Sequence, residues 1–129
     1  MATERRALVV DDDDSVRNVI SDYLAGRGFE VVPARDGLEG AAFARRLSFD
    51  LVAVDLMMPR GGGLDVIRAV RASGSRAAVI VITGYATAQN VKSALEAGAD
   101  KVMSKPVELG ELGAAAEELM AGGDSDRES

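Results

Sequence analysis

Acidic residues gather at two points of this sequence where phosphate or metal chemistry could take place. Four consecutive aspartates, Asp11 to Asp14, follow the apolar run 7–10, and Asp55 follows the apolar run 51–54. Two like charges about 4 Å apart repel by roughly 4 kcal/mol at an effective dielectric constant near 20. A divalent cation would relieve that repulsion, and carboxylates plus water suit Mg²⁺, with Mn²⁺ as an alternative. The aspartates therefore predict a metal site.

Two further apolar runs end in groups that suit phosphoryl oxygens. Thr83 and Gly84 follow one run, and Lys105 and Pro106 follow another. A hydroxyl and an ammonium can both contact a phosphoryl group, and a glycine lets that group approach the backbone closely. Each of these residues alone is ordinary at a strand end. Their joint placement favours phosphoryl chemistry.

The aspartates also have a purely structural interpretation. Asp13 and Asp14 can be solvated residues, with Asp14 or Ser15 capping the helix that follows. Asp11 and Asp12 come directly after the apolar run, where the predicted fold already places a ligand site. The functional interpretation is therefore assigned to the first two aspartates of the run.

Short apolar runs alternate with segments of helical spacing, and these elements must bring the polar groups together. Runs that are apolar at consecutive positions are typical of parallel strands covered on both faces. We expect strands at 7–10, 29–32, 51–54, 78–82 and 101–103, with helices around 16–24, 38–47, 64–70, 91–95 and 109–119. This alternation predicts an α/β fold with a doubly wound, five-stranded parallel sheet, flavodoxin-like, in the order 2-1-3-4-5. In that order the ligand site lies at the carboxyl ends of strands 1 and 3.

Length and composition indicate a single folded domain. A chain of 129 residues suits one compact core, and 47% hydrophobic with 28% charged residues is ordinary for a globular protein. We expect an N-terminal extension at residues 1–6, the domain at 7–121 and a disordered polar tail at 122–129, which lacks apolar anchors. Since no linker to an output domain remains, a stand-alone domain is expected.

Charge and residue usage exclude several classes of function. The net charge of −6 disfavours binding to nucleic acid or to an anionic membrane surface. No cysteine is present, which excludes thiolate metal sites and fits a cytoplasmic location, and no signal or membrane-spanning pattern occurs. The sequence also contains no histidine. Phosphate chemistry in this chain must therefore use carboxylates.

Four segments resemble the receiver domains of two-component response regulators, a likeness that covers roughly residues 6–120. They are LVVDDDDSVR, LVAVDLMMPRGGGLDVI, VIVITGYA and KVMSKPV. The resemblance implies that Asp55 accepts a phosphoryl group from a sensor histidine kinase or a histidine phosphotransfer protein. It also implies that the chain catalyses its own phosphorylation and dephosphorylation and is not an enzyme with a separate substrate.

The resemblance further assigns roles to individual residues. Asp12 would bind Mg²⁺ directly and Asp11 largely through water, while Asp55 and the backbone carbonyl of Met57 would supply the other ligands. Lys105 would contact the bound phosphoryl group.

The remaining implied roles concern the signal. The peptide bond before Pro106 would be cis, an arrangement largely confined to proline. On phosphorylation Thr83 would move inward and repack the face made by the last two helices and the strand between them, within residues 91–119. A partner protein would then bind that face, and the chain would be a monomer or a weak dimer.

The sequence departs from the family pattern at several positions. Lys101 stands where a switching Tyr or Phe is usual, although it can equally be an exposed edge residue. Gly61 to Gly63 replace the usual Asp-Gly, which predicts a looser loop. Met57 and Tyr85 occupy positions that modulate hydrolysis of the phosphoryl group in the family.

Three alternatives compete with a phosphorylated receiver. A pseudo-receiver would share the fold and act by docking alone, but the acidic, Thr and Lys set is intact. A haloacid-dehalogenase-like phosphatase would carry a second aspartate at the position of Met57. A flavin or nucleotide carrier would need a glycine-rich loop where the four aspartates stand.

Overall fold

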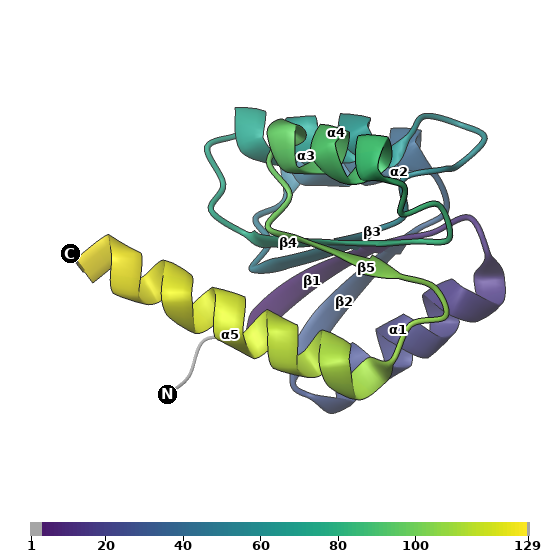
Figure 1. The fold of residues 1–129 in the computed structure, drawn as a ribbon. Coiled ribbons are helices and arrows are strands. Elements are labelled where there is room, and N and C mark those ends of the chain that lie inside the picture. Colours follow the sequence, from purple (N-terminus) through teal and green to yellow (C-terminus); the bar gives the residue numbers. More distant parts are fainter. Residues whose placement is uncertain (1–3, 129) are drawn as a thin grey trace.

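Five strands alternate with five helices between residues 4 and 128 (Figure 1). The computed structural model describes the backbone of residues 4–128 and the side chains of residues 4–122. The elements are β1 (Arg5–Val10), α1 (Asp14–Gly26), β2 (Phe29–Ala34), α2 (Gly37–Arg46), β3 (Leu51–Val54), α3 (Gly63–Ala72), β4 (Ala78–Thr83), α4 (Ala88–Ala97), β5 (Lys101–Ser104) and α5 (Leu109–Glu128). All strand pairs are parallel, in the order β2-β1-β3-β4-β5, which confirms the predicted fold class.

Helices cover both faces of the sheet, with α1 and α5 on one side and α2, α3 and α4 on the other (Figure 1). Neighbouring residues of one strand belong to different cores: Leu51 and Ala53 pack with the α1 and α5 side, whereas Val52 and Val54 pack with the other. A strand covered on both faces must be apolar at every position. This explains the uninterrupted apolar runs of the sequence.

The strand registers bring the predicted site residues to one edge of the sheet. Val10 pairs with Val54, and the backbone N–H of Asp55 donates to the carbonyl of Val10 at 3.0 Å. In the same way, the N–H of Lys105, just after β5, donates to the carbonyl of Thr83 at the end of β4 at 2.9 Å. The carboxyl ends of four strands therefore lie side by side.

The sheet begins earlier than the sequence pattern indicates. β1 starts at Arg5, which pairs with Phe29, so two residues of the predicted extension 1–6 belong to the sheet. The Arg5 guanidinium lies 4.4 Å from the centre of the Phe29 ring and hydrogen-bonds to Glu117 of α5. These contacts allow a charged residue to stand in the strand. Residues 1–3 lie outside the described part of the chain.

The last helix, α5, extends through Glu128 and so includes most of the stretch 122–129. The sequence predicts disorder there, and the side chains of residues 123–129 are outside the described part, so the tail stays a prediction. No helix between residues 4 and 128 combines the length and apolar character that crossing a membrane requires.

Candidate functional site

Three carboxylates meet at the carboxyl ends of β1 and β3. Asp11, Asp12 and Asp55 each place one carboxylate oxygen within 4.8 Å of the other two. Asp11 and Asp55 are 2% and 5% exposed, whereas Asp12 is open to solvent. Oxygen ligands with one open side suit a hard cation that retains part of its water shell. The predicted acidic cluster therefore exists in the fold and could hold a metal ion.

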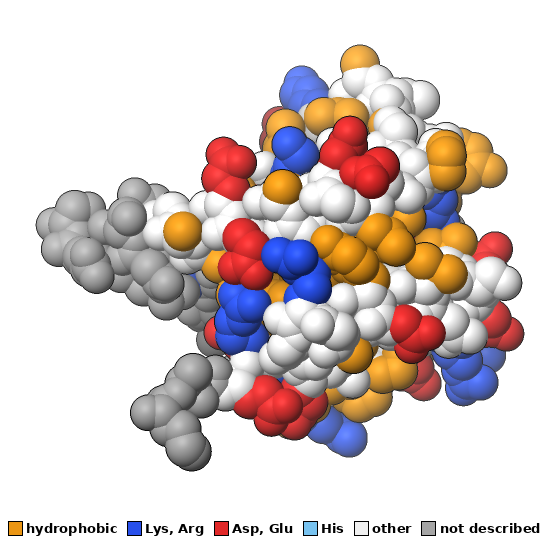
Figure 2. All heavy atoms as spheres, turned by 90° about the horizontal axis from the view of Figure 1, so that it is seen from below, with side chains coloured by type: hydrophobic (Ala, Val, Ile, Leu, Met, Phe, Trp, Pro, Cys, Tyr) orange, Lys and Arg blue, Asp and Glu red, His pale blue; other side chains and the backbone are white. Residues whose placement is uncertain are grey.

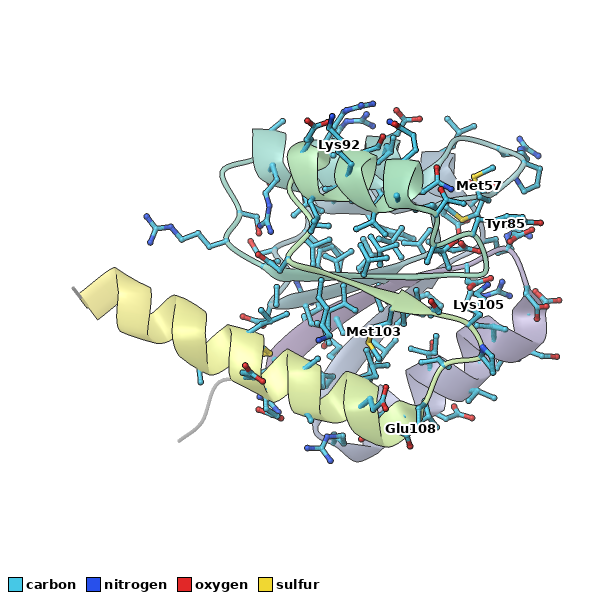
Figure 3. All side chains as sticks on the ribbon, in the orientation of Figure 1. Met57, Tyr85, Lys92, Met103, Lys105 and Glu108 are labelled. Carbon is cyan, nitrogen blue, oxygen red and sulfur yellow. The ribbon has the colours of Figure 1, made fainter. Side chains whose placement is uncertain are left out.

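Lys105 brings an ammonium group to the same cluster. Its Nζ lies 3.0 Å from Asp11 Oδ2 and 3.0 Å from Asp55 Oδ2. The peptide bond between Lys105 and Pro106 is cis. Figure 3 shows Lys105 at the same edge of the molecule as Met57 and Tyr85. The ammonium thus contacts two of the three carboxylates, and the group keeps an excess of negative charge.

The charges of this site are only partly compensated. Burial raises the pKa of Asp11, although the backbone N–H of Asp13 and the ammonium of Lys105 act in the opposite direction. Burial lowers the pKa of Lys105, but its hydrogen bonds to Asp11 and Asp55 outweigh burial and leave that pKa raised. The site therefore favours a protonated lysine and disfavours an ionised Asp11. A bound cation would remove this mismatch.

Backbone groups hold the two buried carboxylates in place. The N–H of Asp13 donates to Asp11 Oδ1 at 2.9 Å, and the N–H of Met57 donates to Asp55 Oδ1 at 3.3 Å. The Met57 side chain is 53% exposed at the rim of the site. Each buried carboxylate thus shares its oxygens between one backbone donor and Lys105, so both have a defined orientation. Binding of a metal by the Met57 carbonyl stays a prediction.

Thr83 is completely buried at the end of β4, and its hydroxyl oxygen accepts a hydrogen bond from the backbone N–H of Tyr85 at 3.1 Å. The Tyr85 carbonyl in turn accepts from the side-chain amide of Asn90 in α4 at 2.7 Å. The Tyr85 side chain is 60% exposed. A Cβ added to Gly84 would meet no atom within 4 Å, so the space beside this glycine is open.

Lys101 does not join the cluster. It is exposed at the first position of β5, where it pairs with Ile80, whereas Lys105 follows the last position of that strand. Lys101 instead lines a groove of about 470 Å³ between β5 and α5. This position is compatible with both interpretations of Lys101, an edge residue and a residue of a signalling face.

The loop after β3 is more tightly packed than its glycines suggest. The N–H of Gly63 donates to the Leu56 carbonyl at 3.1 Å, and a Cβ at Gly63 would overlap the carbonyl oxygen of Asp55. Gly61 has φ of +81° and accepts a hydrogen bond from the N–H of Gly37. These glycines permit close contact with the backbone of Asp55 and Leu56 and with α2, and the expectation of a loosened loop stays a prediction.

Asp13 in the acidic segment and Arg17 just after it have roles that the sequence patterns did not indicate. The N-cap of α1 is Asp13, whose Oδ1 accepts from the N–H of Val16 at 3.1 Å, and not Asp14 or Ser15. Arg17 contacts both the Asp11 carbonyl and the Asp14 carboxylate. The spacing of three residues between Asp14 and Arg17 is the only sequence signal for this arrangement.

The fold and the acidic site define a parallel α/β domain with a cluster of carboxylates at the carboxyl edge of its sheet. The family model described as "Response regulator receiver domain" matches residues 7–117, and the chain belongs to this family. The resemblance seen in the sequence motifs is thereby confirmed. Phosphorylation on an aspartate and Mg²⁺ binding follow from membership.

Individual relatives agree with this assignment. The DNA-binding response regulator MtrA of Mycolicibacterium paratuberculosis is 38% identical over 108 residues, which are 84% of this chain and 48% of the relative. A CheY-like receiver domain protein of Methanospirillum hungatei JF-1 superposes with a TM-score of 0.91 at 28% identity, covering 96% of this chain and 99% of the other.

A third comparison concerns a response regulator of Burkholderia pseudomallei solved with a phosphorylated aspartic acid, a calcium ion and citrate. It has a TM-score of 0.80 and 29% identity, and the match covers 92% of this chain and 72% of that one. The chain spans about half or less of the length of the curated relatives it matches. What those relatives do as whole proteins therefore does not transfer with the receiver fold.

Proposed function

We propose that Asp55 is the phosphoacceptor of this receiver domain. The observation that carries the proposal is the position of its carboxylate, which is buried, lies within the acidic cluster and contacts the Lys105 ammonium at 3.0 Å. A nucleophile needs this combination of a fixed orientation and nearby positive charge for phosphoryl transfer. The solved relative with a phosphorylated aspartic acid supports the same chemistry.

In the proposed reaction an Asp55 carboxylate oxygen attacks the phosphorus of a phosphohistidine on a kinase or phosphotransfer protein. A P–O bond forms while the P–N bond breaks, and the imidazole leaves with the bond electrons and takes up a proton. Lys105 is close enough to contact the oxygens of the transferred group. Water later cleaves the acyl phosphate, which returns the carboxylate and releases inorganic phosphate.

The metal in this proposal is Mg²⁺, with Mn²⁺ as an alternative. Asp11, Asp12 and Asp55 supply carboxylate oxygens in one cluster, and the Met57 carbonyl is the further proposed ligand. When bound, the ion neutralises charge on the phosphoryl oxygens. Because Lys105 already bridges Asp11 and Asp55, metal binding must compete with that ammonium for the two carboxylates.

An apolar groove beside the site suits the phosphodonor protein. The groove has a volume of about 550 Å³ and is lined by Ser15, Val16, Val19, Lys105, Pro106 and Val107. Figure 2 shows the face covered by α1 and α5, where hydrophobic side chains gather between charged ones. Val19 is 48% exposed. The groove thus offers apolar contact next to the reacting carboxylate, which supports a histidine kinase or phosphotransfer protein as the partner.

The proposed output is binding of a downstream protein by the face of α4, β5 and α5. The groove at Lys101 lies on this face and also includes Glu108, Glu111 and Glu118. We propose a cytoplasmic monomer or weak dimer that signals without touching nucleic acid or membrane itself and turns over no separate substrate. DNA binding is named for MtrA as a whole, of which this chain matches about half.

Incubation with acetyl phosphate, with and without Mg²⁺, tests the proposal by mass spectrometry. Wild-type protein gains the mass of one phosphoryl group only with Mg²⁺, and Asp55→Ala gains none. The matched control is Asp65→Ala, which removes an exposed carboxylate of α3 and keeps the gain. No gain on wild type would favour the pseudo-receiver, and equal gain on Asp55→Ala would place the phosphoryl group elsewhere.

A further inference from the structure

Arg17 is a largely buried arginine in α1 that contacts the acidic segment without hydrogen-bonding to the three carboxylates of the metal cluster. Its side chain is 12% exposed. Nη1 donates to the backbone carbonyl of Asp11 at 2.9 Å, and Nη2 donates to Asp14 Oδ1. The two donors of one planar guanidinium therefore connect both ends of the four-aspartate run. A planar fork of this kind sets direction as well as distance.

The contact with the Asp11 carbonyl orients the first proposed metal ligand. That carbonyl belongs to the peptide that joins Asp11 to Asp12, so holding it fixes the direction in which Asp12 leaves β1. Asp11 is held on its other side by the bond from its own N–H to the carbonyl of Ala34. The backbone at the end of β1 is thus restrained from both sides.

Among the four aspartates 11–14, only Asp12 has a carboxylate that accepts no hydrogen bond from the described part of the chain and is free to bind a metal. Asp11 accepts from the Asp13 N–H and from Lys105, Asp13 accepts from the Val16 N–H, and Asp14 accepts from Arg17. Among the residues whose side chains are described, none donates to the carboxylate of Asp12. Asp14 occupies the second donor of Arg17, which keeps the guanidinium from pairing with Asp12.

We propose that Arg17 is a positioning residue for the metal site, and that Asp14 keeps it in that position. The inference rests on the proposed Mg²⁺ site. Arg17 holds the peptide between Asp11 and Asp12 so that the free carboxylate points into the cluster before the metal arrives. Loss of such an outer contact typically lowers metal affinity by roughly 10- to 100-fold. A merely structural arginine would change the stability of α1 and leave the affinity of the folded protein unchanged.

The test is Mg²⁺ binding to the full chain, followed by amide NMR shifts, for wild type, Arg17→Met and Arg17→Lys. Arg17→Met is expected to raise the Kd by at least about tenfold. Arg17→Lys keeps the charge but not the fork, so its Kd should lie between the two. The matched control is Arg68→Met, because Arg68 forms an exposed ion pair with Asp65 of α3 at the same spacing. Its Kd should equal that of wild type.

Labelling by acetyl phosphate provides the second measurement. In Arg17→Met the Mg²⁺ concentration for half-maximal rate should rise by the same factor as the Kd, while the rate at saturating Mg²⁺ stays near that of wild type. If Arg17→Met does not fold, Arg17→Lys and Asp14→Ala carry the test, and both should bind Mg²⁺ more weakly than wild type.

Equal Mg²⁺ affinity in wild type and in the folded Arg17 variants would overturn the inference. So would wild-type affinity in Arg17→Lys, since charge alone would then suffice. Failure of wild type itself to bind Mg²⁺ would instead contradict the proposed metal site. The two failures are therefore distinguishable in one experiment.

Discussion

The two ends of the sheet differ in how far their charged side chains are compensated by neighbouring groups. At the carboxyl end, three carboxylates cluster and the ammonium of Lys105 contacts two of them, Asp11 and Asp55. At the amino end, the guanidinium of Arg71 donates to the carbonyls of Gly98, Ser75 and Ala77 and to the carboxylate of Asp100. One end is left with uncompensated charge, whereas at the other end the guanidinium of Arg71 in α3 connects two loops, the one before β4 and the one before β5.

The pKa shifts follow the same division. At the amino end, the hydrogen bond from Arg5 lowers the pKa of Glu117 and outweighs burial, which acts in the opposite direction. At the carboxyl end, burial raises the pKa of Asp11. The ion pair of Arg5 and Glu117 thus favours folding at the amino end, whereas at the carboxyl end the burial of Asp11 outweighs its contact with Lys105 and costs stability. Such a cost is expected where a site must bind a ligand that the free protein lacks.

The largest expected effect on stability is at the amino end. Arg71→Met should lower the free energy of unfolding by about 2–4 kcal/mol, since it removes several charged hydrogen bonds to part-buried carbonyls at once. Urea unfolding measures this loss. Mg²⁺ affinity should stay at the wild-type value, because the substitution lies at the far end of the strands. A matching loss of Mg²⁺ affinity in the folded variant would show that the two ends are coupled.

A smaller effect is expected where the backbone of the site is closely packed. Gly63→Ala should lower the free energy of unfolding by about 1–3 kcal/mol, because its Cβ would overlap the Asp55 carbonyl. The displaced backbone should also slow labelling by acetyl phosphate. Gly26→Ala is the control, since a Cβ there meets nothing within 4 Å. Wild-type stability in Gly63→Ala would mean that the loop yields easily.

The smallest expected effect is a stabilisation. The pKa of Asp11 in the folded protein is raised above its ordinary value of 3.8. As the pH rises from that ordinary value to the raised one, the unfolded state loses its proton first, so the wild-type protein becomes less stable. Asp11→Asn removes the titrating group. In the presence of a chelator its Tm should equal that of wild type near pH 3 and exceed it by a few degrees at pH 7. A Tm below that of wild type at pH 7 would show that the contact with Lys105 outweighs burial.

Much of the fold could be predicted because the strands carry their own signal. The run 51–54 is apolar at every position, as a doubly covered strand requires, and it lies where predicted. The start of β1 was missed, because Arg5 and Arg6 are charged and gain their place through contacts with residues distant in the sequence, Phe29 and Glu117 among them. Local sequence patterns do not reveal contacts between residues that are far apart in the chain.

The candidate site was predictable in its members but not in its arrangement. Asp11, Asp12, Asp55 and Lys105 follow from strand ends and motifs, and the fold brings all four together. The pairing of Arg17 with the Asp11 carbonyl could not be predicted from the sequence, because every residue has a backbone carbonyl and the residue type therefore gives no signal for this contact. The close packing of Gly63 against Asp55 was missed for the same reason.

By itself, the sequence determined the class of this protein, since the alternation of apolar runs sets the parallel sheet and the motifs at the strand ends identify the receiver family. Only the tertiary structure decided which charges are compensated. Compensation depends on distances of a few ångströms between groups far apart in the chain, such as Lys105 and Asp55. Strand periodicity sets which residues reach the edge of the sheet, but packing sets which of them remain free to bind.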